Sequence, residues 1–291
     1  MEHIIGNTHI VSLFERLLQN GQLGHAYCLV GPAHIGKHTI ACEVAAQYLG
    51  TTSVQLRMHP DMFELSPEDK ENGKIKIEVV RSCKEFLSHT SVHGRGLVVL
   101  IDDAHTLTDE AANALLKSIE EPPKKTLFLL VTPFESLLPQ TIRSRCQILQ
   151  CTTVGREEII QALVTRGTSL DDAHMYASCA DGRVGVAFGC ASSFDVYTQI
   201  NGCRIQSERL RHAPLYEKIQ VVQDVTDDEI VSLSERIACW CVADMQYVRT
   251  EIIRTGTIDT AVLDYVCGYP KLLETLRTNT NKQLTLEQFV F

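Results

Sequence analysis

The chain has 291 residues, of which 44% are hydrophobic and 22% are charged, a composition typical of a soluble globular protein of two or three domains. No apolar run is long enough to span a membrane, and residues 1–7 lack the regions of a signal peptide, so we expect a cytoplasmic protein without membrane contacts. The formal net charge is −9, and the sequence contains no basic stripe. Since DNA-binding surfaces are normally basic, the chain itself is expected to contact few DNA phosphates.

The 11 cysteines are scattered along the chain and form no Cys-x-x-Cys pair. The closest two, Cys239 and Cys241, have a spacing that does not suit a zinc knuckle. In a reducing compartment such cysteines behave as small buried apolar groups. We therefore predict no zinc and no other metal-binding cluster.

The first 150 residues alternate between short apolar runs and stretches with helical periodicity. A loop is predicted at 66–74, strands at 26–30, 97–101, 126–131 and 147–151, and helices around 11–18 and at 39–49, 77–87 and 109–121. Strands that alternate with helices are typical of a parallel α/β sheet. The last of these helices has clear boundaries, because Thr108 is a suitable N-cap and Pro122 stops the helix.

Strand signals stop after about residue 152. Residues 153–193 have the pattern of short helices, and residues 204–291 that of longer ones, with apolar residues at helical spacing at Ile230, Leu233, Ile237 and Trp240. We place domain boundaries near residues 152 and 200.

A phosphate-binding loop is indicated by the pattern Gly31-x-x-x-x-Gly36-Lys37, which follows a predicted strand and precedes a predicted helix. Backbone N–H groups, the helix N-terminus and the lysine charge all favour an anion there. The next residue is normally Ser or Thr, whose hydroxyl binds magnesium. Here it is His38, whose imidazole suits softer metals, and the side chain of Thr39 is turned about 100° away along the helix. The loop therefore either binds nucleotide phosphate with weak or absent magnesium, or is kept for its shape.

Two acids, Asp102 and Asp103, follow the apolar strand 97–101, as in a Walker B motif. Asp102 is a candidate magnesium ligand. A hydrolysing site also needs a carboxylate that orients water, usually glutamate, and Asp103 is one methylene shorter. Misplacement by about 1 Å can lower a rate about 100-fold. The alternative interpretation is a pair of solvated acids after a strand.

An arginine lies at the far end of the same domain, in Ser144-Arg145-Cys146. A guanidinium stabilises the charge on a transferring phosphoryl group, often from a neighbouring subunit. A lone arginine is more often a surface or salt-bridge residue, so the interpretation of Arg145 depends on its surroundings.

Those surroundings resemble a known family, the delta-prime subunits of the bacterial DNA polymerase III clamp loader, which are AAA+ proteins. The resemblance rests on four segments: His25-Ala26-Tyr27, the run from Leu116-Lys117 to Glu120-Glu121-Pro122, Ser144-Arg145-Cys146, and residues 279–287. Together they extend over nearly the whole chain. The Ser-Arg-Cys segment in this setting is specific to clamp-loader subunits, whereas the phosphate loop alone is not.

The resemblance implies a RecA-like AAA+ domain with a parallel sheet at 1–152, a helical lid at 153–200 and an all-helical collar at 201–291. It implies that Arg145 is an arginine finger, placed by Ser144 and Cys146, that acts on the nucleotide of an adjacent subunit. The implied partners are gamma/tau-type motor subunits and a clamp-opening delta subunit in a hetero-pentameric ring, with the sliding clamp and primed DNA reached through the complex. The implied cofactor is ATP or ADP.

Several positions depart from the pattern of this family's hydrolysing members. Residues 50–60 contain no cysteine, so the four-cysteine zinc module of many relatives is missing. Gly185 stands where motor subunits carry a lid arginine, with Arg183 two residues earlier. His38 and Asp103 depart as described above, while Thr132 occupies the position of a polar sensor. We expect a stator subunit with no ATPase activity of its own.

Two alternatives stay open on the sequence. One is an autonomous AAA+ ATPase, either a gamma/tau-like motor subunit or another remodelling enzyme. The other, a kinase of small molecules, leaves the Ser-Arg-Cys segment and the helical C-terminal third without a role.

Overall fold

The computed structural model describes residues 4–67, 73–123 and 125–212, together with Trp240, Cys241, Asp244, Tyr247, Val248, Ile252, Cys267, Gly268 and Leu272. The chain divides into two compact units, residues 1–188 and residues 189–291. Among the helices of the described ranges, none combines the length and apolar character needed to cross a lipid bilayer.

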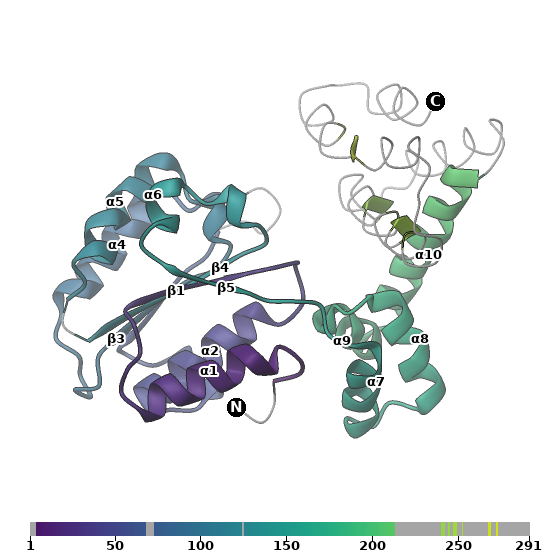
Figure 1. Cartoon of the computed structure of the whole chain (residues 1–291), viewed down its shortest axis with the longest axis horizontal. Coiled ribbons are helices and arrows are strands. Elements are labelled where there is room, and N and C mark those ends of the chain that lie inside the picture. The colour runs from purple at the N-terminus through teal and green to yellow at the C-terminus, as the bar shows by residue number, and fades with distance from the viewer. Residues whose placement is uncertain are drawn as a thin grey trace. The chain divides into compact units, whose positions relative to one another are not determined.

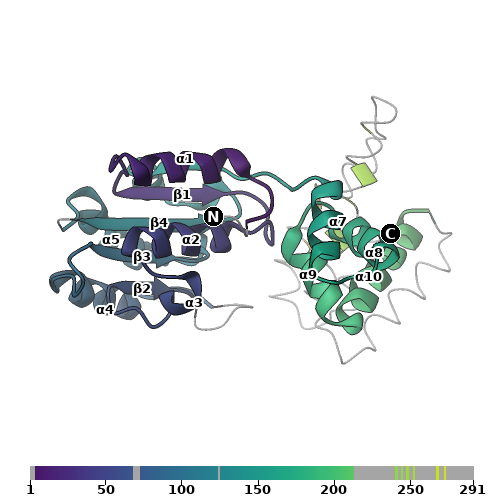
Figure 2. The same cartoon turned by 90° about the horizontal axis from the view of Figure 1, so that it is seen from below.

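A five-stranded parallel sheet forms the centre of the first unit, in the order β2-β3-β4-β1-β5. Figure 2 shows β1, β4, β3 and β2 following one another across it. The strands are β1 (Ala26–Val30), β2 (Met62–Leu65), β3 (Leu97–Ile101), β4 (Thr126–Thr132) and β5 (Gln147–Gln150). The three inner strands β1, β3 and β4 are buried throughout, which is why their sequences are continuous apolar runs.

Helices cover both faces of this sheet (Figure 1). One face packs against α1 (Thr8–Gln19) and α2 (Lys37–Leu49), and the other against α4 (Ile77–Ser88) and α5 (Asp109–Glu120). Successive side chains of a strand alternate between the two cores. In β1, for example, Tyr27 and Leu29 contact the first core, and Cys28 and Val30 the second. Each large apolar side chain buried in this way stabilises the fold by about 1.5–3 kcal/mol.

The predicted elements agree with this sheet, and the parallel α/β prediction is confirmed. The strand prediction was one residue short for β4 and one residue long for β5, and α2 begins two residues earlier than predicted, at Lys37. Thr108 caps α5 as expected, because its side chain accepts a hydrogen bond from the Ala111 N–H at 3.2 Å. The sequence did not predict β2 or the short helices α3 (Ser53–Leu56), η1 (Ala104–Thr106), η2 (Glu135–Leu137) and α6 (Gln140–Arg143).

A small helical core follows the sheet within the first unit. It is built from α7 (Arg156–Thr165), α8 (Leu170–Ala180) and the start of α9 (Val184–Ser192), and its buried residues are mostly alanine, isoleucine and valine. Asp181 and Gly182 both adopt positive φ between α8 and α9. This turn brings the start of α9 to the phosphate loop, as described below.

The second unit contains the helix α10 (Phe194–His212), which begins in the predicted lid and extends past residue 200. Ser207 on this helix donates a hydrogen bond of 2.6 Å to the Asp244 carboxylate, and Trp240 is buried, as its predicted place on an apolar helix face suggested. Residues Ile230, Leu233 and Ile237 lie outside the described residues. The helical collar and the boundaries near residues 152 and 200 stay predictions.

Candidate functional site

The candidate phosphate loop connects β1 to α2 at the edge of the sheet where the strands end, which we call the carboxyl edge. Gly31 has φ 153°, and a Cβ there would lie 2.3 Å from the carbonyl oxygen of Cys151. Gly36 has φ 94° and comes directly before α2. His34, between them, also has a positive φ of 64°. The glycines of the motif are therefore required by backbone geometry, whether or not a phosphate binds.

Lys37 is 6% exposed, and its ammonium group is bound to its own loop. Its Nζ donates a hydrogen bond of 2.6 Å to the Pro32 carbonyl oxygen. Burial lowers the pKa of Lys37, and the thiol of Cys151 and the carboxylates of Asp103 and Asp102 oppose this effect. This bond uses one of the three N–H donors of the ammonium group, and the other two are not assigned a partner by it.

His38 takes the place of the magnesium-binding hydroxyl and is paired with two side chains. Its Nδ1 lies 3.6 Å from the Cys42 Sγ, and its Nε2 lies 3.1 Å from Glu64 Oε1 on β2. The hydrogen bonds to Cys42 and Glu64 raise the pKa of His38 to about 10. Thr39 lines the same small depression. An imidazolium paired with a carboxylate does not fit magnesium coordination, so the residues present do not match the magnesium site that the motif implies.

The two acids after β3 lie at the same edge as Thr132, which was expected to follow the fourth strand and is instead the last residue of β4. Asp102 is half-buried, and burial raises its pKa while His38 opposes the rise. Asp103 is exposed, with φ 48°, and its Oδ1 lies 4.0 Å from His105 Nδ1. Thr132 is buried, and its hydroxyl donates a hydrogen bond of 3.2 Å to the Phe134 carbonyl. The expected sensor hydroxyl is thus bound within its own loop.

The start of α9 contacts the phosphate loop directly. The Gly185 N–H donates a hydrogen bond of 2.7 Å to the His34 carbonyl oxygen, and a Cβ at Gly185 would lie 3.1 Å from that oxygen. Arg183 donates from Nε to the Ala180 carbonyl at 3.1 Å. The position of a lid arginine is therefore occupied by a close backbone contact between the helical core and the loop.

Arg145 lies at the edge where the strands begin, which we call the amino edge. Its Nε and Nη2 both donate to Glu120 Oε1, and its Nη1 donates to the Thr141 carbonyl at 2.7 Å and to Ser144 Oγ at 3.1 Å. The side chain of Arg145 is 30% exposed. It lines an open depression of about 390 Å³ with His25, Glu120 and Ser144. The guanidinium is oriented by residues of its own chain and still faces solvent.

Cys146, the last residue of the Ser-Arg-Cys segment, points to the interior. It packs against the core under α4 and α5, and burial raises the pKa of its thiol to about 12. At neutral pH this thiol is protonated, so Cys146 anchors the segment by packing.

The two candidate groups lie on opposite edges of one sheet. Lys37 comes after β1, whereas Arg145 comes before β5, which pairs with β1 in parallel with Tyr27 opposite Gln147. The five residues of β1 therefore separate the two edges by about 16 Å. Arg145 does not belong to the phosphate loop of its own chain.

The groups that bind the candidate residues leave little signal in the sequence. Glu64, the partner of His38, lies on the unpredicted strand β2. Glu120, the partner of Arg145, was noted only as part of a motif. His34 contacts Gly185 through its backbone, which leaves no signature in the sequence. Among the described residues, no three His, Cys, Asp or Glu side chains are arranged to bind a metal ion, and the absence of zinc stays a prediction.

Comparison with known proteins gives a consistent set of relatives. A family model described as DNA polymerase III, delta subunit, matches residues 6–155. The delta′ subunit of Pseudomonas aeruginosa DNA polymerase III is 37% identical over 158 residues, 50% of this chain and 48% of that protein. The Escherichia coli delta′ subunit is 42% identical over 99 residues, 34% and 29% of the two chains. The gamma subunit of Buchnera aphidicola (subspecies Schizaphis graminum) is 32% identical over 170 residues, which are 55% of this chain and 47% of that protein. The matches thus span about half the length of these relatives or less.

Solved structures with a similar fold include a DNA polymerase III gamma subunit-related protein from Thermotoga maritima. It has a TM-score of 0.54 at 18% identity and covers 95% of this chain and 97% of that one. A variant of the Thermotoga maritima RuvB protein has a TM-score of 0.52 at 18% identity, over 96% and 87% of the chains. At such low identity the likeness concerns the fold alone.

Proposed function

The chain belongs to the family of DNA polymerase III delta′ subunits, and on this premise we propose that it is a clamp-loader stator, which presents Arg145 to the nucleotide of a neighbouring subunit and hydrolyses no ATP itself. The proposal includes a place in DNA replication, where the assembled loader puts the sliding clamp on primed DNA. It rests first on the position of Arg145.

The observation that carries the proposal is the separation of Arg145 from its own phosphate loop. About 16 Å of sheet lies between them, while a guanidinium must contact a phosphate oxygen to stabilise its charge. A phosphate that Arg145 binds must therefore come from another molecule. Because the guanidinium is exposed and its ion pair with Glu120 lies at the surface, exchanging that carboxylate for a phosphate costs only about 1 kcal/mol or less.

The state of the phosphate loop supports the absence of hydrolysis. Lys37 is bound to Pro32, and His38 is bound to Glu64 where magnesium chemistry needs a hydroxyl. Asp103 is too short to replace the glutamate that orients water. Without a magnesium ion and an oriented water, phosphoryl transfer loses the groups that neutralise and direct it.

The loop still has features that suit ATP or ADP phosphates. Three positive-φ residues shape its backbone, and Lys37 is the one cation buried beneath it in the described part of the chain. Binding there would use a further N–H donor of the Lys37 ammonium, together with backbone N–H groups and the N-terminus of α2. Nucleotide binding without turnover is thus part of the proposal.

The proposed partners follow from the family. The relatives at about a third identity include gamma subunits, which are the candidates for the neighbour that receives Arg145. A clamp-opening delta subunit would complete a five-membered ring in the cytoplasm. The net charge of −9 favours contacts with primed DNA and the clamp through the other subunits.

The test is hydrolysis by the chain alone and by a loader reconstituted with the motor and delta subunits, clamp and primed DNA from the same source. We expect no turnover by the chain alone. In single-turnover experiments with radiolabelled ATP, Arg145→Ala should slow hydrolysis at the adjoining site about 1,000-fold, because an arginine finger has effects of this size.

A matched control is Arg143→Ala, which removes an exposed arginine at the end of α6, two residues before Arg145. The Nη1 of Arg143 lies 3.6 Å from Glu135 Oε1. A loader reconstituted with this variant should hydrolyse ATP at the wild-type rate. Unchanged hydrolysis in Arg145→Ala would refute the finger role, and brisk turnover by the isolated chain would favour the alternative of a gamma-like motor.

A further inference from the structure

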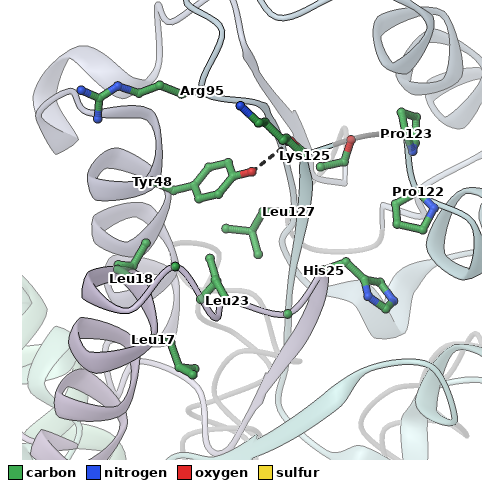
Figure 3. Close-up of a pocket in the computed structure, with 13 residues that line it drawn as sticks. Leu17, Leu18, Leu23, His25, Tyr48, Arg95, Pro122, Pro123, Lys125 and Leu127 are labelled. Carbon is green, nitrogen blue, oxygen red and sulfur yellow. Dashed lines mark hydrogen bonds between the residues drawn. The ribbon is translucent and has the colours of Figure 1, made fainter.

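A pocket of about 450 Å³ opens at the amino edge of the sheet, beside the segments that lead into β1 and β4 (Figure 3). Its floor is apolar, and Pro122 and Pro123 lie along one side. The leucines that line it come from the end of α1, from the loop before β1 and from β4, and they are Leu17, Leu18, Leu23 and Leu127. Neither the phosphate loop nor the helical core contributes to this pocket.

The lining of the pocket is cationic in an acidic protein. Lys125, Arg95 and His25 line it, and no described residue of the lining is Asp or Glu. The whole chain, by contrast, carries 36 acidic and 27 basic side chains. Apolar floors with a charged rim are the features that protein–protein interfaces use for anchoring side chains. The complementary ligand is therefore an apolar side chain with a carboxylate beside it.

Lys125 is held at the rim in an unusual backbone conformation. Its φ is 59°, in the left-handed region that costs a residue with a Cβ about 1 kcal/mol or more. Two donors fix its carbonyl oxygen: the Tyr48 hydroxyl at 3.0 Å, drawn as a dashed line in Figure 3, and the Leu97 N–H at 2.9 Å. Retained backbone strain of this kind is concentrated at functional positions.

The pocket adjoins the depression that contains Arg145, because one residue lines both. The exposed His25 lines both this pocket and the depression that contains Arg145, Ser144 and Glu120. A molecule that brings a phosphate to Arg145 therefore also comes close to the pocket. The amino edge thus offers one extended surface, with a guanidinium at one end and an apolar pocket at the other.

We propose that this pocket is the docking site for a segment of the adjacent clamp-loader subunit that inserts an apolar side chain and places a carboxylate beside Lys125. The inference rests on the proposed function, since it takes the neighbour of Arg145 as the occupant. Docking here would fix the orientation of the two subunits, and Arg145 would act on the nucleotide that is brought within reach.

The test measures the affinity of the full chain for the gamma-type motor subunit from the same source, by isothermal titration calorimetry at two salt concentrations. Lys125→Glu should weaken binding about 10-fold at low salt, and less at high salt, because the new charge repels the carboxylate of the occupant. Leu18→Gln should weaken binding about fivefold at both salt concentrations, because it makes the floor polar. Leu18 lies outside the buried cores, so its replacement spares the fold.

The matched control is Lys84→Glu, the same charge reversal at an exposed position on α4, which should bind within twofold of the wild type. Wild-type affinity in both pocket variants would overturn the docking proposal. The finger role is tested separately by hydrolysis with Arg145→Ala at saturating subunit concentration, where docking affinity no longer limits the rate. Its failure there would refute the proposed function, and normal affinity in the pocket variants would refute the docking site alone.

Discussion

Each of the two edges of the sheet carries a cationic side chain that is hydrogen-bonded within the chain, but the two differ in how far they are exposed. At the carboxyl edge, the polar groups of the nucleotide site bind one another: Lys37 binds Pro32, and His38 binds Glu64. At the amino edge, Arg145 is also paired, with Glu120, but the pair lies at the surface beside an open pocket. The first edge resembles a closed site and the second an available one.

Burial distinguishes Lys37 from Arg145, whereas the His38–Glu64 pair, at 33% and 35% exposed, is about as accessible as the Arg145–Glu120 pair. Lys37 is 6% exposed, so separating its ammonium from the Pro32 carbonyl without a new partner would leave a charge buried. Arg145 and Glu120 are 30% and 45% exposed, and water can replace either partner. A surface ion pair contributes about 1 kcal/mol or less, so Arg145 is free to exchange partners. The comparison shows that the cation after β1 is buried, whereas the cation before β5 reaches the surface.

After Arg145→Ala, the largest expected effect comes from Arg145→Lys, which keeps the positive charge and removes the planar fork. Lysine cannot make paired hydrogen bonds to one phosphate, so hydrolysis at the adjoining site of the reconstituted loader should fall about 100-fold. Single-turnover hydrolysis measures this, with Arg143→Lys as the control. Full activity of Arg145→Lys would mean that residue 145 needs only a positive charge, and not the planar guanidinium, to act on the phosphate.

Much of the fold was predictable from the sequence, because β1, β3 and β4 are buried on both faces and therefore read as apolar runs. The strand β2 was missed because it has four residues, lies at the edge of the sheet and exposes Glu64. The start of α2 was placed late for a related reason. Its first residues, Lys37 and His38, are polar, and Gly36 rather than apolar periodicity sets the boundary.

The candidate site was predictable only in part. Motif spacing identified the phosphate loop and the Ser-Arg-Cys segment, because those patterns are local in sequence. The partners that decide the state of each group are not local: Glu64 lies 26 residues from His38, and Glu120 lies 25 residues from Arg145. The sequence therefore indicated candidate groups, and the tertiary structure determined which residues of the chain each of them binds.

Replacing Gly31 tests whether the backbone of the phosphate loop requires a glycine at this position. A Cβ at this position would lie 2.3 Å from the Cys151 carbonyl oxygen, so Gly31→Ala should lower the free energy of unfolding by about 3 kcal/mol. Gly36→Ala is the matched control, since it also has a positive φ but meets no atom within 4 Å, and should cost about 1 kcal/mol. Urea denaturation measures both. Equal losses in the two variants would show that the contact with Cys151 is relaxed in solution.

The pairing of His38 should appear in the pH dependence of stability. Its pKa is raised from 6.5 to about 10 in the folded chain, so its contribution is fully present below pH 6.5 and is lost as the pH rises toward 10. The difference in unfolding free energy between the wild type and His38→Gln should shrink over that range. The full shift in the pKa corresponds to about 5 kcal/mol, and because the side chain of His38 is 33% exposed, solvent screening should keep the measured change well below that value.

Glu64→Gln provides the control for this pH dependence, since it removes a carboxylate that raises the pKa of His38 and keeps the size of the side chain. In the Glu64→Gln background, the pH dependence of the effect of His38→Gln should move to lower pH. A difference between wild type and His38→Gln that does not vary from pH 6 to pH 10 would contradict the charged pairing at the carboxyl edge.

The smallest expected effect is that of His38→Thr, which restores the hydroxyl that magnesium chemistry needs. The isolated variant should still show no ATP turnover, because Asp103 stays too short to orient water and Gly185 keeps the helical core bonded to His34 where a lid arginine would act. A coupled ATPase assay with and without magnesium measures this, with the wild-type chain as the reference. Brisk hydrolysis by His38→Thr would mean that the His38 side chain alone prevents ATP hydrolysis at the carboxyl edge. In that case the contrast between the two edges would depend on His38 rather than on the whole arrangement of the loop.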